Sequence, residues 1–334
     1  MAAQESLHTD SFPTVYELIP QQDGTLREFY SDFLEMTAKS WILETGSPTS
    51  YRLAEEVHPI VQSYRTSLSE DVRCAACSAP SSLYQTNPRL LEQYLSILKT
   101  RPPPSKEYDQ QFIVPENVVR RAAFMNARGD LANRRLLIIG DDDLFSIVVA
   151  LSGLAAEVVV LDVDTRIIDF LNRCAEQFSL KLKAYPFDIR LPFPQEFYRR
   201  FDTFNCDPVE TLEGIKLFLS AGAIGLRGPG STIYFGLTTM EAGLQKWHAI
   251  EQQLLDMNFA ITDVKRKFNE YMCTDFDDDF TIQQKLGPNA RKFNWYRSSL
   301  VRLEAWDTPL PCTDVDITRP NLCEIYVDSE TWAT

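Results

Sequence analysis

The stretch RRLLIIGDDDLF, residues 134–145, decides the fold of this chain. Its first half is an unbroken apolar run, which is typical of a strand buried on both faces of a parallel sheet. The run ends at Gly140, and a helical pattern starts near Leu144. In doubly wound α/β proteins, this strand end usually opens a glycine-rich loop that approaches a phosphate or an adenosyl group. Here three aspartates follow instead, so the sequence brings negative charge to the place where such a ligand would bind.

Apolar runs and helical stretches alternate after this first strand. Further strands are predicted at EVVVLDV (157–163), LKAYPFD (182–188), FDTFNCD (201–207) and STIYFGL (231–237). Helical patterns fill the intervals at 144–155, 165–180, 209–223 and 241–258. Two long strand-like runs follow without a helix between them, FAITDVKRKFNEY (259–271) and NWYRSSLVRLEAW (294–306). The whole pattern predicts an α/β fold of the class I methyltransferase-like (Rossmann-like) type, a doubly wound sheet that ends in an antiparallel hairpin.

The region before residue 106 has a different pattern. Helical spacing of apolar residues recurs at 25–44, 54–68 and 87–100, and RPPPSKEYDQ (101–110) is a proline-stiffened linker. We therefore expect a smaller, mostly helical N-terminal domain over residues 1–105, for which a winged-helix-like form is one alternative. Residues 106–334 are predicted to form the Rossmann-like catalytic domain.

The overall charge of the 334 residues is −14. Such a charge disfavours nucleic acid binding, which relies on Lys and Arg at the phosphates. It suits a cationic ligand, although solubility alone also explains an acidic surface. The seven cysteines are scattered and odd in number, which indicates reduced thiols and a cytoplasmic location. The start has no secretory pattern and no apolar stretch approaches the roughly 18 residues of a membrane span, so we expect no membrane partner.

Polar side chains, most of them acidic, follow each of the first four predicted strands. The carboxyl ends of parallel strands meet at one edge of the sheet, where doubly wound proteins bind their ligands. The groups at these ends are Gly140, Asp141, Asp142 and Asp143, then Asp162 and Asp164, then Asp188, and finally Asn205 and Asp207. We predict that Asp162 binds the ribose hydroxyls of an adenosyl ligand and that Asp188 accepts from its adenine amino group. Gly140, Asp164 and Asn205 are expected to line the same nucleoside site.

Helix capping is a simpler explanation for aspartates at strand ends. Three consecutive aspartates exceed what a cap needs, and clustered carboxylates repel one another unless a cation compensates them. That cation is either a metal or an amine. His8, His58 and His248 lie far apart in the sequence, and the pair Cys74 and Cys77 has no second pair at zinc-site spacing. We therefore expect no metal, although Mg²⁺ held by carboxylates alone stays open.

The motifs GDDDL (140–144), RPPPSKEYDQ (101–110), VLDVD (160–164) and NCDPVET (205–211) together resemble the branched-chain polyamine synthase family, the N4-bis(aminopropyl)spermidine synthases. The resemblance covers residues 101–306. It implies that an aminopropyl group moves from decarboxylated S-adenosylmethionine to an internal nitrogen of spermidine. It also implies catalytic or acceptor-side roles for Asp141, Asp142, Asp143 and Asp207, and substrate contacts for Tyr108, Asp109 and Glu210. The chain departs from the family in Val209, where a second proline is expected.

The chemistry implied by this resemblance explains the acidic strand ends. An amine attacks only when it is unprotonated, and a carboxylate beside it can accept its proton while others hold the flanking ammonium groups. Within the triplet we expect Asp142 and Asp143 on the reacting side. Trp295 and Tyr296 either cover a ligand or, as is commoner, pack within their strand. The predicted partners are a polyamine and a second copy of the chain in a homodimer. Two alternatives stay open: an S-adenosylmethionine-dependent methyltransferase and a non-catalytic polyamine- or nucleoside-binding protein.

Overall fold

The computed structural model describes residues 26–45, 50–58, 88–239, 241–272, 296–321 and 323–331. Contacts along the chain divide it into two units, residues 1–66 and 67–334. This division falls earlier than residue 105, where the sequence pattern changes. The reason is that helix α5 (Pro88–Leu98) buries Leu90, Tyr94 and Ile97 in the core of the second unit.

The described part of the first unit combines a helix with a hairpin. It contains α3 (Leu26–Ala38), β1 (Ile42–Thr45), β2 (Ser50–Leu53) and the short 3₁₀ helix η3 (Glu55–Val57). The two strands pair antiparallel, and Phe33 of the helix packs with Ile42 and Leu53 in a small core. Most of the helix expected at 54–68, and both Cys74 and Cys77, lie outside the described residues.

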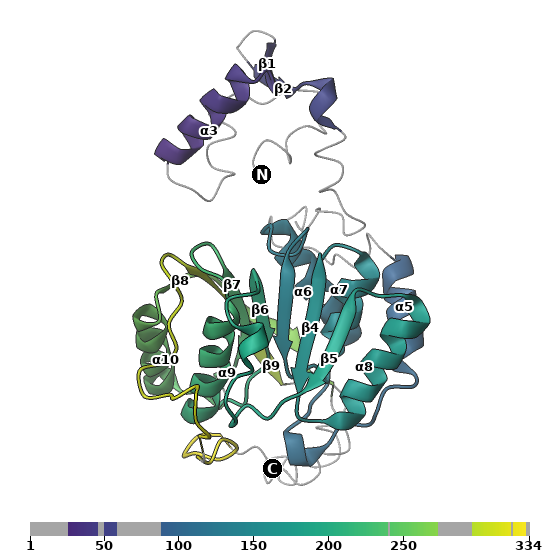
Figure 1. The fold of residues 1–334 in the computed structure, drawn as a ribbon, viewed down its shortest axis with the longest axis vertical. Helices are drawn as coiled ribbons and strands as arrows, with labels where there is room; N and C mark the ends of the chain where they lie inside the picture. Colours follow the sequence, from purple (N-terminus) through teal and green to yellow (C-terminus); the bar gives the residue numbers. More distant parts are fainter. Residues whose placement is uncertain are drawn as a thin grey trace. The chain divides into compact units, whose positions relative to one another are not determined.

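The second unit is built on a seven-stranded sheet, which confirms the predicted fold class (Figure 1). The order of its strands is β5-β4-β3-β6-β7-β9-β8. Their bounds are β3 (Arg135–Ile139), β4 (Glu157–Asp162), β5 (Leu182–Pro186), β6 (Thr203–Cys206), β7 (Thr232–Leu237), β8 (Phe259–Glu270) and β9 (Arg297–Ala305). The first five strands are parallel, and β9 pairs antiparallel with both β7 and β8.

Helices cover both faces of this sheet because its central strands are apolar on both sides. In β3, Leu136 and Ile138 pack into one core with α5, α6, α7 and α8, whereas Leu137 and Ile139 pack into a second core with α9 and α10. The bounds of these helices are α6 (Pro115–Ala127), α7 (Phe145–Ser152), α8 (Thr165–Phe178), α9 (Leu212–Gly225) and α10 (Leu244–Asp256). Helix α6, which starts with Pro115 at its first turn, was not among the predicted helices.

The strand order reverses direction between β3 and β6. From β3 the chain proceeds to β4 and β5 on one side of the sheet, and it then crosses to β6 and β7 on the other. The loops after β3 and β6 therefore diverge, which leaves a crevice at the carboxyl ends of these two strands. Two short 3₁₀ helices lie in the connecting segments, η5 (Lys106–Tyr108) and η6 (Gln195–Phe197).

The described C-terminal segment beyond β9 forms no helix or strand, and it returns to this crevice. The Thr211 hydroxyl donates to the Ile325 carbonyl at 2.6 Å. The buried Lys246 ammonium of α10 pairs with Asp328 at 2.7 Å and bonds to Thr331 at 2.8 Å. None of the helices in the described part of the chain is long and apolar enough to cross a membrane.

Candidate active site

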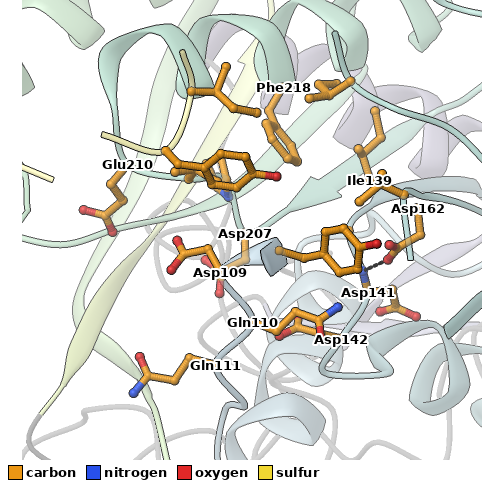
Figure 2. Close-up of a pocket in the computed structure, with 18 of the residues that line it drawn as sticks. Asp109, Gln110, Gln111, Ile139, Asp141, Asp142, Asp162, Asp207, Glu210 and Phe218 are labelled. Atoms are coloured by element: carbon orange, nitrogen blue, oxygen red, sulfur yellow. Dashed lines mark hydrogen bonds between the residues drawn. The ribbon is translucent and has the colours of Figure 1, made fainter. Parts of the chain in front are cut away.

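A pocket of about 360 Å³ opens at the crevice between β3 and β6. Loops after four parallel strands line it, together with residues 107–111, the ends of β8 and β9, and the C-terminal segment (Figure 2). Among the predicted site residues, those that line the pocket are Tyr108, Asp109, Gly140, Asp141, Asp142, Asp162, Asp188, Asp207 and Glu210. Asp143, Asp164 and Asn205 are not among its lining residues.

Asp162, at the end of β4, joins the first two loops of the pocket. Its carboxylate accepts the backbone N–H of Asp141 at 2.9 Å (Figure 2). It also accepts the backbone N–H of Asp164 at 2.8 Å. Burial raises the pKa of Asp162 to about 6, although these two hydrogen bonds act in the opposite direction. A carboxylate offers about four acceptor positions, so acceptor capacity remains for a hydroxyl of a ligand. Gly140 precedes this contact with φ +73°, a conformation that favours glycine.

The three consecutive aspartates have three different surroundings. Asp141 accepts the backbone N–H and the hydroxyl of Ser146 at the start of α7, so for this residue the capping explanation holds. Asp143 accepts the backbone N–H of Ile113 at 2.6 Å, and its carboxylate is directed away from the pocket lining. Asp142 lines the pocket, and its carboxylate accepts no hydrogen bond from the described part of the chain.

Asp142 is therefore the member of the triplet that is available to a ligand. Burial, followed by repulsion from Asp143 and Asp207, raises its pKa well above the ordinary value for aspartate. Ionising this group in the empty pocket is costly, and a bound cation would lower that cost.

Asp207, after β6, is held in place by residues from two other strands. Its carboxylate accepts the hydroxyl of Tyr271 at 2.6 Å, and Tyr271 also bonds to Ser298 at 3.0 Å. A Cβ atom at Gly236 of β7 would lie 2.0 Å from Oδ1 of Asp207, so glycine provides the space that this carboxylate occupies. Burial raises the pKa of Asp207, whereas the positive charge of Arg121 and the bond to Tyr271 lower it.

Two glutamates, Glu210 and Glu241, also line the pocket, and together with Asp142 and Asp207 they form what we call the acidic wall. Glu210 accepts both the N–H and the hydroxyl of Thr238 at 2.7 Å, and burial raises its pKa to about 8. Glu241 accepts the hydroxyl of Tyr296 at 2.8 Å, and burial raises its pKa as well. Glu241 had not been singled out, because it carries no motif and starts a predicted helix. Tyr296 lines the pocket, in agreement with the alternative in which it covers a ligand.

The remaining predicted residues lie at the rim of the pocket or behind it. Asp109 is exposed at the mouth with φ 52°, directly after Tyr108 of η5. Asp188 lines the pocket but pairs with Arg190 at 2.7 Å, and this hydrogen bond lowers its pKa. Asp164 caps α8 and accepts from Arg166 and Gln110. Asn205 lies in β6 with an exposed fraction of 2%.

The lining of the pocket divides by chemistry. Apolar surface, which suits a nucleoside, comes from Ile139, Leu161, Phe187 and Phe218. Carboxyl groups come from Asp109, Asp142, Asp207, Glu210 and Glu241. In the described residues, no three His, Cys, Asp or Glu side chains are grouped as metal ligands would be.

A methyltransferase-like sheet with an acidic pocket at its switch point defines a class of protein: transferases that use an adenosyl co-substrate and act on a cationic acceptor. The sequence model of the branched-chain polyamine synthase A C-terminal domain matches residues 89–333. This chain therefore belongs to the branched-chain polyamine synthase family.

Individual relatives agree with this assignment. The chain is 39% identical over 254 residues to the N(4)-bis(aminopropyl)spermidine synthase of Methanocaldococcus jannaschii, covering 75% of this chain and 72% of the relative. It is 35% identical over 278 residues to the enzyme of the same name from Thermococcus kodakarensis, covering 82% and 78%. A crystal structure of a mutein of the Thermus thermophilus branched-chain polyamine synthase superposes with a TM-score of 0.69 at 27% identity, covering 100% of this chain and 92% of that one. That structure is a complex with N4-aminopropylspermidine and 5′-methylthioadenosine.

Proposed function

We propose that this protein is an aminopropyltransferase that moves the aminopropyl group of decarboxylated S-adenosylmethionine to an internal nitrogen of spermidine. The observation that carries this proposal is the Asp142 carboxylate. It lines the pocket, accepts no hydrogen bond from the described residues, and faces repulsion from neighbouring acids. Such a group favours a cation as its partner, and a polyamine is a chain of cations. The ligands in the Thermus thermophilus complex, a branched polyamine and the thioether that remains after aminopropyl transfer, support the same reaction.

The reaction needs a nitrogen that is free of its proton. The internal ammonium group of spermidine first loses a proton, and the resulting amine attacks the propyl carbon next to the sulfonium. A C–N bond forms, the C–S bond breaks with its electrons going to sulfur, and 5′-methylthioadenosine leaves. We assign the proton acceptor to Asp142, because its carboxylate lines the pocket without a donor among the described residues, and because its raised pKa makes it a stronger base than an ordinary aspartate.

Asp207 has a fixed orientation, because Tyr271 donates to it and Gly236 leaves it room. We assign to it the orientation of the reacting nitrogen. Glu210 and Glu241 lie farther along the same wall of the pocket, and with Asp109 they form the set that holds the flanking ammonium groups. We assign Asp143 a supporting role and no longer a place on the reacting side, because its carboxylate accepts the N–H of Ile113.

The acidic wall also distinguishes between adenosyl donors. Ordinary S-adenosylmethionine carries a carboxylate on the chain that would face Asp142 and Asp207, whereas the decarboxylated form ends in an ammonium group. Like charges at close range in a buried pocket disfavour binding. We therefore propose the decarboxylated molecule as co-substrate, bound through its ribose to Asp162 and through its adenine to the apolar residues of the pocket lining.

The decisive experiment is to incubate the protein with decarboxylated S-adenosylmethionine and spermidine and to identify the products by mass spectrometry. We expect one or two mass increments of an aminopropyl group on spermidine, with fragmentation that places them on the internal nitrogen, and 5′-methylthioadenosine in equal amount. S-adenosylmethionine in place of the decarboxylated donor should give no product. Methylated spermidine would favour a methyltransferase, and binding of both ligands without turnover would favour a binding protein.

A further inference from the structure

Arg121 of α6 is a buried cation next to the acidic pocket. Its exposed fraction is 2%, and it does not line the pocket. Its Nη2 lies 4.0 Å from Oδ2 of Asp143, and its guanidinium lies 5.6 Å from the ring centre of Phe145. Neither Nε nor Nη2 has a hydrogen-bond partner in the described part of the chain. Burying a guanidinium with so few hydrogen bonds is costly, so the surrounding charges must compensate it.

Five titratable groups lie close enough to Arg121 for its positive charge to lower their pKa, and two of them are carboxylates, which Asp142 faces in turn. The five groups are Tyr94 of α5, Asp143 after β3, Cys206 and Asp207 at the end of β6, and Tyr271 after β8. The positive charge of Arg121 lowers the pKa of Asp143 and of Asp207, whereas burial raises both. Arg101 adds a second positive charge near Asp143, and its guanidinium lies 3.3 Å from the ring centre of Phe112.

We propose that Arg121 is a positioning residue of the aminopropyl transfer site, because its buried guanidinium, 4.0 Å from the Asp143 carboxylate, supplies a fixed positive charge behind the acids that face a polyamine. The inference rests on the proposed function. Buried outside the pocket lining, Arg121 has no contact with a bound polyamine. Its charge instead reaches the ligand through Asp207, which lines the pocket, and through Asp143, which holds the 107–113 segment by its bond to Ile113.

A neutral side chain at position 121 should weaken polyamine binding near neutral pH and strengthen it at alkaline pH. Without the guanidinium, Asp207 and Asp143 take up protons at a higher pH, so near neutral pH the pocket loses negative charge and binds a polyamine more weakly. At alkaline pH both acids are ionised in the variant and in the parent, and the variant lacks a cation that repels the ligand. The acid limb of the pH profile therefore moves to higher pH, by about one unit, the shift that one nearby opposite charge produces.

The test compares Arg121→Met with Arg121→Lys and with a matched control, Arg128→Met. Arg128 lies at the end of the same helix and pairs with Asp263 at 2.7 Å, and it is not among the pocket-lining residues. The dependence of kcat/KM for spermidine on pH, from 6 to 9.5, is measured for all three variants and the parent. Titration calorimetry with spermidine at pH 6.5 and 9 gives a readout that needs no turnover. Dividing the value for each variant by the value for the parent at the same pH removes the effect of protonation of spermidine itself.

We expect Arg121→Met to move the acid limb upward by about one pH unit, whereas Arg121→Lys and Arg128→Met keep the parental profile even where their melting temperatures fall. The proposal is overturned if the Arg121→Met profile coincides with that of the parent, or if Arg121→Lys shifts it equally. Arg121→Gln serves as a second neutral variant. If neither neutral variant folds while Arg121→Lys does, the charge serves the fold alone, which also overturns the proposal. A parent that neither binds nor converts spermidine would instead refute the proposed function.

Discussion

The stability of the ligand-free protein should fall as pH rises, and Glu210 provides the sharpest test. Its pKa is about 8 in the folded protein, against an ordinary value of 4.5. Between these two values the folded state binds a proton that the unfolded state has released, so stability is highest below pH 4.5 and is lost as pH rises through 8. Each unit of pKa difference corresponds to about 1.4 kcal/mol. Between pH 5.5 and pH 8 the ionisation of this one group therefore lowers the free energy of unfolding by about 3 kcal/mol.

The variant Glu210→Gln removes this proton linkage, keeps one oxygen for the N–H of Thr238, and places an amide N–H₂ group that can donate to the Thr238 hydroxyl; both groups bond to Glu210 at 2.7 Å. Urea unfolding of the parent and the variant, followed by fluorescence at pH 5.5, 7 and 8.5, gives the free energy of unfolding at each pH. We expect the difference, variant minus parent, to grow in favour of the variant by about 3 kcal/mol between pH 5.5 and 8.5. Saturating spermidine should reduce the pH dependence of the parent. A difference that stays constant over this range would refute the assignment of a protonated Glu210 in the empty pocket.

Three further predictions concern the chemistry of the pocket. Asp142→Asn should lower kcat by roughly 10²–10⁴-fold with donor binding nearly unchanged, and a loss below twofold in single-turnover assays would contradict its role as proton acceptor. Asp162→Ala should raise the KM of the donor more than it lowers kcat, because a ribose contact is made equally in the ground and transition states; steady-state kinetics showing only a loss of kcat would argue against that contact. Decarboxylated S-adenosylmethionine should bind at least about tenfold more tightly than S-adenosylmethionine, a difference of about 1.4 kcal/mol, and calorimetry with equal affinities would count against the acidic wall as a selector.

The sheet could be predicted because its information is local. Each of the first four parallel strands is a short, mostly apolar run with an aspartate at its end or within two residues of it, and this pattern needs no knowledge of the partner strand. The loop after β3 was located for the same reason. Helix α6 was missed, because most of its residues are buried and these include the polar Asn117, Arg121 and Asn126, so polarity does not mark its exposed side.

The division of labour within the triplet depends on partners far away in the sequence. Asp143 bonds to Ile113, 30 residues upstream, whereas Asp141 bonds to Ser146, five residues downstream. Nothing in the letters DDD distinguishes these two directions, so the reacting side was assigned to Asp142 and Asp143 together. Glu241 precedes α10 and Tyr271 follows β8, and the fold brings both to the pocket. No sequence motif marks either of them.

Because Gly236 leaves space for the Asp207 carboxylate, substitutions at these two positions depend on each other. A methyl group at position 236 would lie 2.0 Å from the Asp207 carboxylate, so alanine there would force this carboxylate out of the orientation in which Tyr271 donates to it. The shape of the pocket at Asp207 is therefore set in part by a residue that does not line it. Directed evolution of this pocket toward longer or differently branched amines should randomise codons 207 and 236 jointly, because a change at either position alters the space available at the other.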